Sequence, residues 1–268
     1  MFGKNKSRPI VVGTDKLQVH KVFSTIQGEG PWSGYPAVFI RLSGCNLRCF
    51  FCDTKWDDDK DKLYSAEEVV SMVKVEHERT ATNHSIKRVV LTGGEPARQD
   101  CAKLLDLLNN EGYLVQIETA GTYYPDWFFQ LDCIVVSPKT AHVHKLFFHD
   151  SSNTELTHWK YVLRAGETST VDGLPNACTQ ELDPSIIEGL VPDSAYSKIP
   201  RIKALTVLND KFGSPARPVG FQGTNIWVSP CNEYDDYKNR ANCLEVAESC
   251  MKFGYRAQVQ LQNYLQVP

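Results

Sequence analysis

Three cysteines fall within eight consecutive positions, at Cys45, Cys49 and Cys52 in the segment "SGCNLRCFFCDT". Thiolates on one short loop are soft ligands that suit zinc or an iron–sulfur cluster. A structural zinc site needs a fourth ligand, usually from a second pair of Cys or His residues. The remaining cysteines occur singly, at Cys101, Cys133, Cys178, Cys231, Cys243 and Cys250. The spacing therefore favours a four-iron cluster with one open iron, and zinc stays the alternative.

Two charged residues near this loop also have types and positions that can bind a ligand. Arg41 interrupts the apolar segment "PAVFIRL" and needs an anionic partner if it is buried, either a ligand carboxylate or an internal Asp or Glu. Glu29 lies between glycines in "QGEG". A carboxylate there can accept two parallel N–H groups of a ligand, or it can be a solvated side chain on a turn.

The elements that must position these residues alternate along the chain. The Ser65-x-x-Glu68 capping box predicts the start of the first helix, and Gly112 is a plausible end of the second. An apolar C-terminal strand is expected to run on to Pro268. The predicted strands lie within 38–42, 88–91, 113–122, 133–139, 158–163, 225–229 and 255–261, and the predicted helices within 64–80, 101–112 and 233–253.

Strands alternating with helices predict a parallel sheet with helical crossovers. Polar or glycine-rich clusters follow several of the strands, and ligands of such folds bind at the C-terminal ends of the strands. We therefore expect one α/β domain over residues 1–268, folded as a full or partial TIM-type barrel. Residues 1–16 are expected to form an N-terminal extension. Residues 165–221, where Gly, Pro, Ser and Asn separate short apolar pieces, are expected to form an insertion.

The composition excludes several other classes of protein. The chain has 268 residues, of which 42% are hydrophobic and 23% charged, as in ordinary globular proteins. Its net charge of −3 gives no attraction to nucleic acid. No apolar run approaches the ~20 residues of a membrane helix, and no apolar stretch follows the basic N-terminus, so no secretory signal is expected. Nine cysteines then indicate a reducing compartment, with the cytosol as the default.

The Cys-x3-Cys-x2-Cys spacing, with Phe51 before the last cysteine, resembles the signature of the radical S-adenosylmethionine (SAM) superfamily. This resemblance implies a partial, incomplete TIM-type barrel. It also implies a [4Fe–4S] cluster on Cys45, Cys49 and Cys52 whose open iron binds SAM and cleaves it to a 5′-deoxyadenosyl radical. The segment "LTGGEP" resembles a second motif of that superfamily. The resemblance implies a SAM site lined by Phe51, Asp53, Gly94, Glu95, Glu118, Ser137, Pro138 and Lys139. For Glu118, a solvated loop carboxylate is the competing interpretation.

A longer segment, "FSTIQGEGPWSGYPAVFIRLSGCNLRCFFCDT", resembles the 7-carboxy-7-deazaguanine synthase family of deazapurine (queuosine-type) biosynthesis. With "VVLTGGEP", "IETAGT", "VSPK" and "VQLQNYLQVP", the likeness extends over most of residues 17–139 and 225–268. It implies conversion of 6-carboxy-5,6,7,8-tetrahydropterin to 7-carboxy-7-deazaguanine with loss of ammonia.

The same resemblance implies the remaining parts of the site and the partners. It places Mg²⁺ on Thr54, and substrate contacts on Ile26, Gln27, Gly28, Glu29, Arg41, Thr92, Gln262 and Pro268. It implies a flavodoxin-like electron donor and a homodimer, with no nucleic-acid or membrane partner. It assigns no side chain a catalytic role beyond that of the cofactor-derived radical.

The chain departs from the family pattern at two places. Leu261-Gln262-Asn263 stands where Thr-His-Lys is usual, and Gln262 can hydrogen-bond but cannot carry a proton near neutral pH. Ser229 in "VSP" stands where Leu-Gln-Pro is common, which leaves one SAM contact unassigned. The competing functions are a glycyl-radical activating enzyme, against which "QGEG" and "CDT" argue, and a non-enzymatic zinc or electron-transfer module, which has no use for "GGEP".

Overall fold

A computed structural model describes residues 15–47, 49, 51–54, 62–80, 87–149, 156–176, 214–218 and 225–268. Of the predicted N-terminal extension, only residues 15 and 16 are in this part, and Lys16 already belongs to the first strand. Within the predicted insertion, residues 177–213 and 219–221 lie outside the described residues, as does Cys178.

The described chain alternates strands with helices. The strands are β1 (Lys16–Ile26), β2 (Pro36–Leu42), β3 (Lys62–Ser65), β4 (Arg88–Gly93), β5 (Leu114–Thr119), β6 (Cys133–Val136), β7 (Thr157–Leu163), β8 (Ile226–Pro230) and β9 (Arg256–Ala257). The α-helices are α1 (Ala66–Thr80), α2 (Ala102–Asn110), α3 (Leu146–His149), α5 (Asp236–Phe253) and α6 (Leu261–Leu265). Three short 3-10 helices complete the set: η1 (Gly30–Trp32), η2 (Pro96–Arg98) and η3 (Asp126–Gln130).

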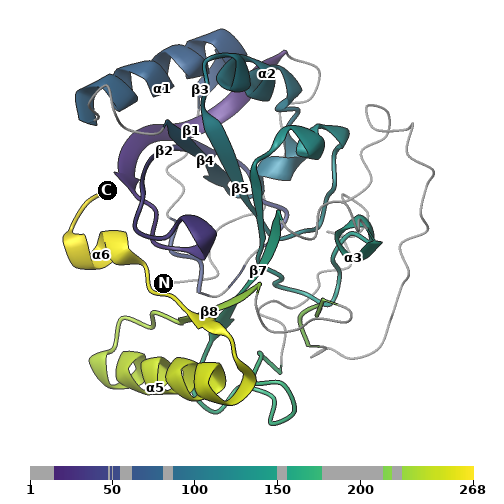
Figure 1. Ribbon diagram of the computed structural model, residues 1–268, viewed down its shortest axis with the longest axis vertical. Coiled ribbons are helices and arrows are strands. Elements are labelled where there is room, and N and C mark those ends of the chain that lie inside the picture. Colours follow the sequence, from purple (N-terminus) through teal and green to yellow (C-terminus); the bar gives the residue numbers. More distant parts are fainter. Residues whose placement is uncertain are drawn as a thin grey trace.

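All the strands belong to one sheet in the order β3-β1-β2-β4-β5-β6-β7-β8-β9. Strand β1 is antiparallel to β2 and β3, and the pairs from β2–β4 through β8–β9 are parallel. The outer strands β3 and β9 do not pair with each other, so the sheet does not close (Figure 1). This arrangement confirms the predicted α/β fold with a partial barrel.

The local signals for helix ends hold in the structure. The Ser65 N–H donates to Glu68 Oε2 at 2.7 Å, and the Glu68 N–H donates to Ser65 Oγ at 3.2 Å, which is the predicted capping box of α1. Gly112 follows α2 with a φ of 75°, in the left-handed region that favours glycine. Helix α5 begins three residues later than predicted, because the Asp235 side chain accepts from the Lys238 N–H and caps it.

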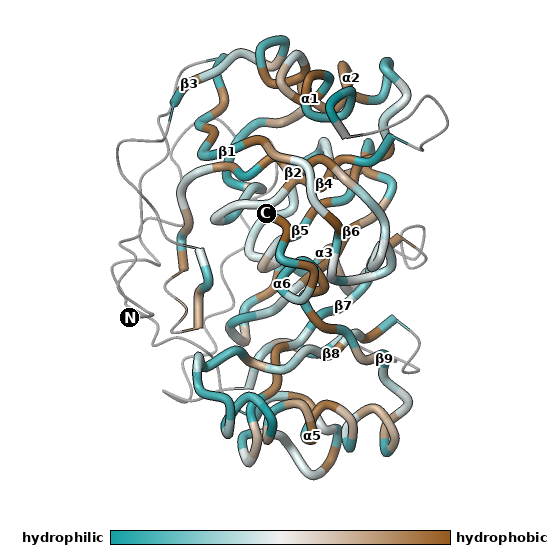
Figure 2. Tube along the Cα trace, turned by 90° about the vertical axis from the view of Figure 1, so that its left-hand side faces the viewer, coloured by the Kyte–Doolittle hydropathy of each residue, from teal (hydrophilic) through white to brown (hydrophobic). Residues whose placement is uncertain are grey.

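Side-chain alternation along the strands separates two faces of the sheet. Val89 and Leu91 of β4 belong to the main core under α1 and α2, whereas Val90 packs with Phe39 and Phe23 on the other face. The central strands are accordingly the most apolar part of the chain (Figure 2). The sheet is therefore buried against helices on its outer face, and its inner face is available for a site.

Two features of the sheet differ from the sequence-based prediction. Strands β1 and β3 were not predicted, although β1 alternates buried Leu17 and Val19 with more exposed neighbours. The predicted C-terminal strand is wrong beyond its start, because β9 has only two residues and residues 261–265 form helix α6. The Gln258 N–H still donates to the Val228 carbonyl of β8 at 2.9 Å, and its side chain accepts a hydrogen bond from the Gly30 N–H at 2.6 Å, so the chain turns from the sheet edge toward the "QGEG" loop beyond this residue.

The described residues of the predicted insertion pack against the body of the domain. The Ser249 hydroxyl of α5 donates to the Gly173 carbonyl at 2.9 Å, and Arg217 forms an ion pair with Asp172 at 2.9 Å. The Tyr161 hydroxyl of β7 donates to the Ala216 carbonyl at 2.7 Å.

Among the described helices, none is long and apolar enough to cross a membrane.

Candidate active site

A row of polar side chains crosses the inner face of the sheet near the C-terminal ends of its strands. Because neighbouring residues of a strand point to opposite faces, the residues that alternate with the buried core positions point to the inner face of the sheet. Each inward position comes from a different strand, and together they line a cavity of about 430 Å³. These residues are Arg41 of β2, Thr92 of β4, Glu118 of β5, Lys160 of β7 and Ser229 of β8.

The three-cysteine loop follows β2 and forms one wall of this cavity, where all three thiols are lining groups. The Cys52 N–H donates to the Cys49 carbonyl at 3.2 Å, which folds the loop back on itself. Burial raises the pKa of the Cys45 thiol to about 12. In the described part of the chain no three His, Cys, Asp or Glu side chains converge on a single metal position. Three cysteines that bind different irons of one cluster do not need to converge in this way.

The "GGEP" segment packs against Gly44, the residue that precedes the first cysteine of the loop. A Cβ at Gly94 would lie 1.8 Å from the Gly44 carbonyl oxygen, so only glycine allows this contact. The Glu95 N–H donates to the same carbonyl at 2.9 Å. The Glu95 carboxylate accepts from the Thr119 hydroxyl and from the Ala120 N–H, both at 2.7 Å. Glu95 is buried, and its hydrogen bonds connect the C-terminal ends of β4 and β5.

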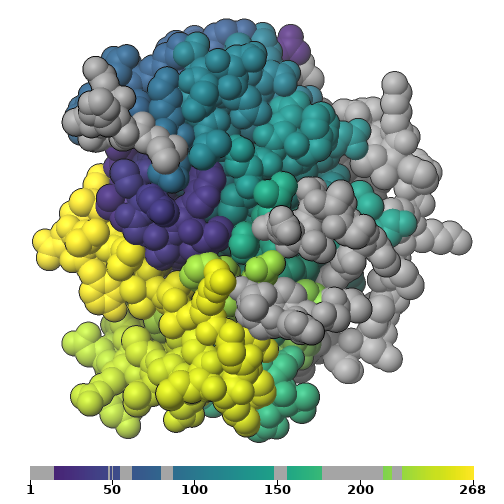
Figure 3. All heavy atoms as spheres, viewed as in Figure 1, coloured from purple at the N-terminus to yellow at the C-terminus, as the bar shows by residue number. Residues whose placement is uncertain are grey.

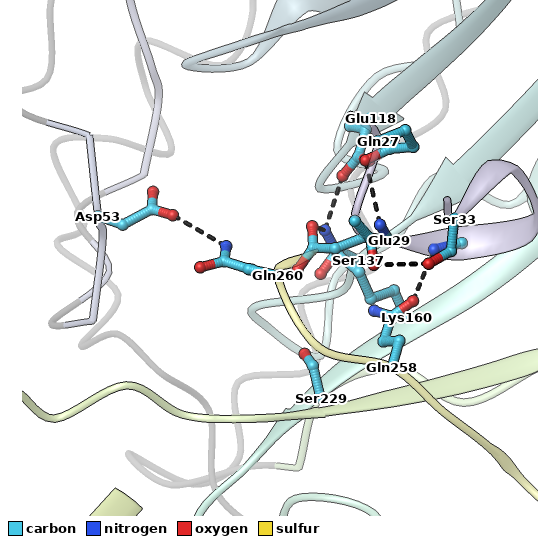
Figure 4. A network of polar contacts seen from close by, with 12 residues as sticks. Gln27, Glu29, Ser33, Asp53, Glu118, Ser137, Lys160, Ser229, Gln258 and Gln260 are labelled. Atoms are coloured by element: carbon cyan, nitrogen blue, oxygen red, sulfur yellow. Dashed lines mark hydrogen bonds and ion pairs between the residues drawn. The ribbon is translucent and has the colours of Figure 1, made fainter. Parts of the chain in front are cut away.

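Lys160 lies between two carboxylates on the opposite side of the cavity (Figure 4). Its ammonium group is 2.5 Å from Glu29 Oε2 and 2.6 Å from Glu118 Oε2. Gln27 holds Glu118 from another direction, because its side-chain amide donates to Glu118 Oε1 at 2.8 Å. Burial raises the pKa of Glu29, and the nearby ammonium opposes that rise. Burial also disfavours the charged form of Lys160, but the two carboxylates outweigh it and raise its pKa.

Arg41 and Thr54 meet between the cysteine loop and the sheet. The Arg41 guanidinium donates to Thr54 Oγ1 at 3.4 Å and lies 5.5 Å from the Phe23 ring centroid. Among the described residues Arg41 forms no ion pair, and its Nε has no hydrogen-bond partner. The internal carboxylate that competed with a ligand as its partner is therefore absent from this part of the chain. Thr54 is buried, and its hydroxyl lies 3.3 Å from Asp53 Oδ1.

The C-terminal segment lines the cavity with residues 259, 260 and 262–264. It adjoins N-terminal residues of the domain, as the neighbouring yellow and purple atoms show (Figure 3). The Gln260 side chain donates to Asp53 Oδ2 at 3.1 Å and joins this segment to the cysteine loop. Gln262 lines the cavity, and its buried Oε1 has no hydrogen-bond partner among the described residues. The last residue, Pro268, accepts a hydrogen bond from the Thr25 hydroxyl.

The structure gathers most of the predicted site residues around this cavity, and five of them do not line it. Those that line it are Cys45, Cys49, Cys52, Phe51, Asp53, Thr54, Gly94, Glu118, Ser137, Lys139, Gln27, Glu29, Arg41, Thr92 and Gln262. Those that are not lining residues are Ile26, Gly28, Glu95, Pro138 and Pro268. Ser229, at the unassigned position, also lines the cavity.

Lys160 is the site residue that sequence reasoning missed. The signal was present, since Lys160 interrupts the apolar strand "HWKYVL" as Arg41 interrupts "PAVFIRL". A buried lysine needs a carboxylate partner, but Glu29 and Glu118 are far away in the sequence. Only the folded sheet shows that these three residues meet.

The family comparison agrees with this geometry. A family model described as the radical SAM superfamily matches residues 39–132, which hold the cysteine loop, "GGEP" and strands β4 and β5. An open α/β sheet with a three-cysteine loop at the C-terminal edge of its strands, together with this match, defines the class as the radical SAM enzymes.

Individual relatives define the family more narrowly. The 7-carboxy-7-deazaguanine synthase of Rhodospirillum rubrum is 35% identical over the full length of both chains. That of Rickettsia prowazekii is 46% identical over 53% of this chain and 59% of its own. The crystal structure of QueE from Escherichia coli superimposes with a TM-score of 0.54 and 25% identity, covering 92% of this chain and 95% of that one. The chain belongs to the 7-carboxy-7-deazaguanine synthase family. This membership does not favour the glycyl-radical activating enzyme as an alternative.

Proposed function

We propose that this protein converts 6-carboxy-5,6,7,8-tetrahydropterin to 7-carboxy-7-deazaguanine with release of ammonia, as a radical SAM lyase of deazapurine biosynthesis. The observation that carries the proposal is that three loop cysteines and two opposed charged sites, at Arg41 and at Glu29 with Lys160, line one cavity. A small acid with a hydrogen-bonding ring can be held at both ends in such a cavity. Full-length similarity to a synthase of this name supports the choice of reaction.

The donor set fits the cofactors that this reaction requires. Cys45, Cys49 and Cys52 would hold the [4Fe–4S] cluster, and their loop offers no fourth thiolate, which leaves one iron for SAM. When bound, the cluster and SAM supply the 5′-deoxyadenosyl radical that begins the reaction. Phe51 lines the cavity, with Lys139 Nζ 5.7 Å from its ring centroid, and by the family resemblance it would contact the adenine of SAM.

The protein's own contribution is orientation of the substrate. Arg41 would bind the substrate carboxylate, because its guanidinium has no anionic partner among the described residues. Glu29, across the cavity, would accept N–H groups of the pyrimidine ring. Gln262 has an unpartnered buried oxygen that would accept one further N–H or O–H group of a ligand. Fixing both ends of a substrate in this way favours one reacting geometry over others.

Thr54 would contribute to a Mg²⁺ site beside the substrate carboxylate. Its hydroxyl lies 3.3 Å from Asp53 Oδ1, so one neutral and one anionic oxygen ligand are close together. Mg²⁺ prefers oxygen ligands and keeps several waters, and the substrate carboxylate would complete the set. The flavodoxin-like reductant and the homodimer are further parts of the proposal and rest on the family resemblance. The cytosolic location is also part of it and rests on the cysteine content.

The test is anaerobic turnover of the reconstituted, reduced protein with 6-carboxytetrahydropterin and SAM. The expected product is 7-carboxy-7-deazaguanine, identified by mass, with ammonia in equal amount. The same assay with and without added Mg²⁺ tests the metal, and a slower reaction without it is expected. Cleavage of SAM without any change of the pterin would contradict the proposed function.

A further inference from the structure

Most hydrogen-bonding groups around Lys160 bind one another, and those without a partner among the described residues indicate what a ligand could bind there. An ammonium group has three N–H donors, and Lys160 directs two of them to Glu29 Oε2 and Glu118 Oε2. Glu118 is satisfied, because its other oxygen accepts from Gln27 at 2.8 Å and from Gln116 at 3.3 Å. Glu29 Oε1 accepts no hydrogen bond within the part of the chain that the structure describes. The cluster therefore presents one free donor beside one free acceptor.

Both free groups belong to side chains that line the cavity and are held rigidly. The side chains of Lys160 and Glu29 are 10% and 13% exposed. The Glu29 N–H donates to Gln27 Oε1 at 3.1 Å, so Gln27 fixes the loop that carries Glu29 as well as the Glu118 carboxylate. Side chains fixed on a strand and on a tied loop lose little conformational freedom when a ligand binds.

We propose that Lys160 and Glu29 together read the cyclic amide of the substrate's pyrimidinone ring. In this inference, which rests on the proposed function, Lys160 donates its third N–H to the exocyclic ring oxygen. Glu29 Oε1 accepts the hydrogen of the neighbouring ring nitrogen. An adjacent donor and acceptor are the complement of an O=C–N–H edge, so Lys160 determines that the ring carries an oxo group at this position.

The charges of the cluster explain why a lysine suits this position. One ammonium and two carboxylates leave one net negative charge, which disfavours a ligand with an anionic ring edge. An ammonium donates only, so it binds an oxo group and rejects an amino group in the same place. Burial raises the pKa of Glu29, and the Lys160 ammonium opposes that rise. Because substrate and product share this ring, the contact can persist through ring contraction.

The experiment measures binding of 6-carboxypterin, which is stable and has the same oxo and amino groups, to the cluster- and SAM-loaded protein without a reductant. The pterin carries ¹³C at its ring carbonyl, so infrared difference spectra report the hydrogen bond to that oxygen. Lys160→Met should weaken binding by about 10- to 100-fold, the loss expected for a hydrogen bond from a charged group. The carbonyl band should move to higher wavenumber. Lys160→Arg should retain most of the band position.

Two further variants separate the local effect from general damage. Lys160→Met leaves two carboxylates facing each other, so the double variant Lys160→Met with Glu118→Gln keeps the net charge of the wild-type cluster. This double variant should show the same shift of the carbonyl band. Lys103→Met is the matched control, because Lys103 pairs with Glu67 on the surface and its side chain is 66% exposed. It should change neither affinity nor band.

The outcomes distinguish this inference from the proposed function. Suppose that the wild-type protein turns over the carboxytetrahydropterin but that neither Lys160→Met nor the double variant moves the carbonyl band. Lys160 then does not contact the ring oxygen, and the inference fails while the proposed function stands. If Lys160→Met weakens pterin binding but leaves the carbonyl band unmoved, the inference also fails, because Lys160 would then only position Glu29. If the wild-type protein neither binds nor converts the pterin, the proposed function fails and the inference fails with it.

Discussion

Replacement of Arg41 by alanine tests the substrate end of the site most directly. In the described part of the chain the guanidinium donates a long hydrogen bond, 3.4 Å to Thr54 Oγ1, and lies 5.5 Å from the Phe23 ring centroid. Its Nε has no hydrogen-bond partner among these residues. The strongest interaction available to Arg41 is therefore the one that it would form with a bound carboxylate, and the substitution should affect binding far more than folding.

The magnitude follows from the chemistry of that pair. Loss of one partner of a buried, hydrogen-bonded charge pair costs about 2–5 kcal/mol. We therefore expect Arg41→Ala to lower kcat/KM for the pterin by about 10² to 10³. Arg41→Lys keeps the charge but loses the planar fork, so its loss should be smaller. The assay is anaerobic steady-state turnover, with SAM binding measured separately and expected to be unchanged.

A structural role for Arg41 would give a different pattern. If Arg41 stabilised the fold, Arg41→Ala would lower the thermal midpoint of the protein. We expect the midpoint to stay the same or rise, because a half-buried cation that has no anionic partner among the described residues is costly in the free state. Unchanged pterin kinetics with a lower midpoint would refute the reasoning. Arg79→Ala is the control, since Arg79 pairs with Glu76 on an exposed helix surface.

Three other predictions concern the cluster, the packing beneath it and the C-terminal segment. Alanine at any of the three loop cysteines should abolish SAM cleavage and lower the bound iron, whereas Cys101→Ala should keep the cluster; the reverse result in iron and sulfide analysis would remove the cluster assignment. Gly94→Ala should destabilise the protein by about 1–3 kcal/mol and displace the cysteine loop, because the new Cβ would meet the Gly44 carbonyl; an unchanged denaturation midpoint would count against this packing. Gln262→His should give little gain in turnover and no new pH limb, whereas a gain of roughly tenfold or more, limited near the imidazole pKa, would indicate a missing acid or base.

Local features of the sequence predicted the local parts of the structure. The Ser65 and Glu68 capping box and the glycine after α2 act over a few residues, so their geometry depends little on the rest of the fold. The cysteine loop, "GGEP" and "IETAGT" could be assigned to strand ends, because the hydrophobic runs that predict the strands stop there at glycines or polar residues. The order of strands and helices was enough to predict an open α/β fold with its site at one edge.

The C-terminal region shows where local reasoning failed. The sequence "RAQVQLQNYLQVP" has an alternating pattern that favours a strand, but the structure keeps only two residues in the sheet. The hydrogen bond from Gly30 to Gln258 and the contacts of Gln262 with the "QGEG" loop join residues more than two hundred positions apart. A pattern within one segment contains no information about such contacts.

The sequence by itself indicated the cofactor chemistry, because the three cysteines predicted to hold the cluster lie on one loop whose spacing is visible in one dimension. It also indicated that Arg41 would need an anionic partner if it is buried. Only the tertiary structure decided what lies beside Glu29 and Arg41: Lys160 and Glu118 meet Glu29, while Arg41 has no carboxylate partner among the described residues. The physical reason is that strand alternation puts each polar residue on the inner face, whereas the order of strands in the sheet decides which of them become neighbours.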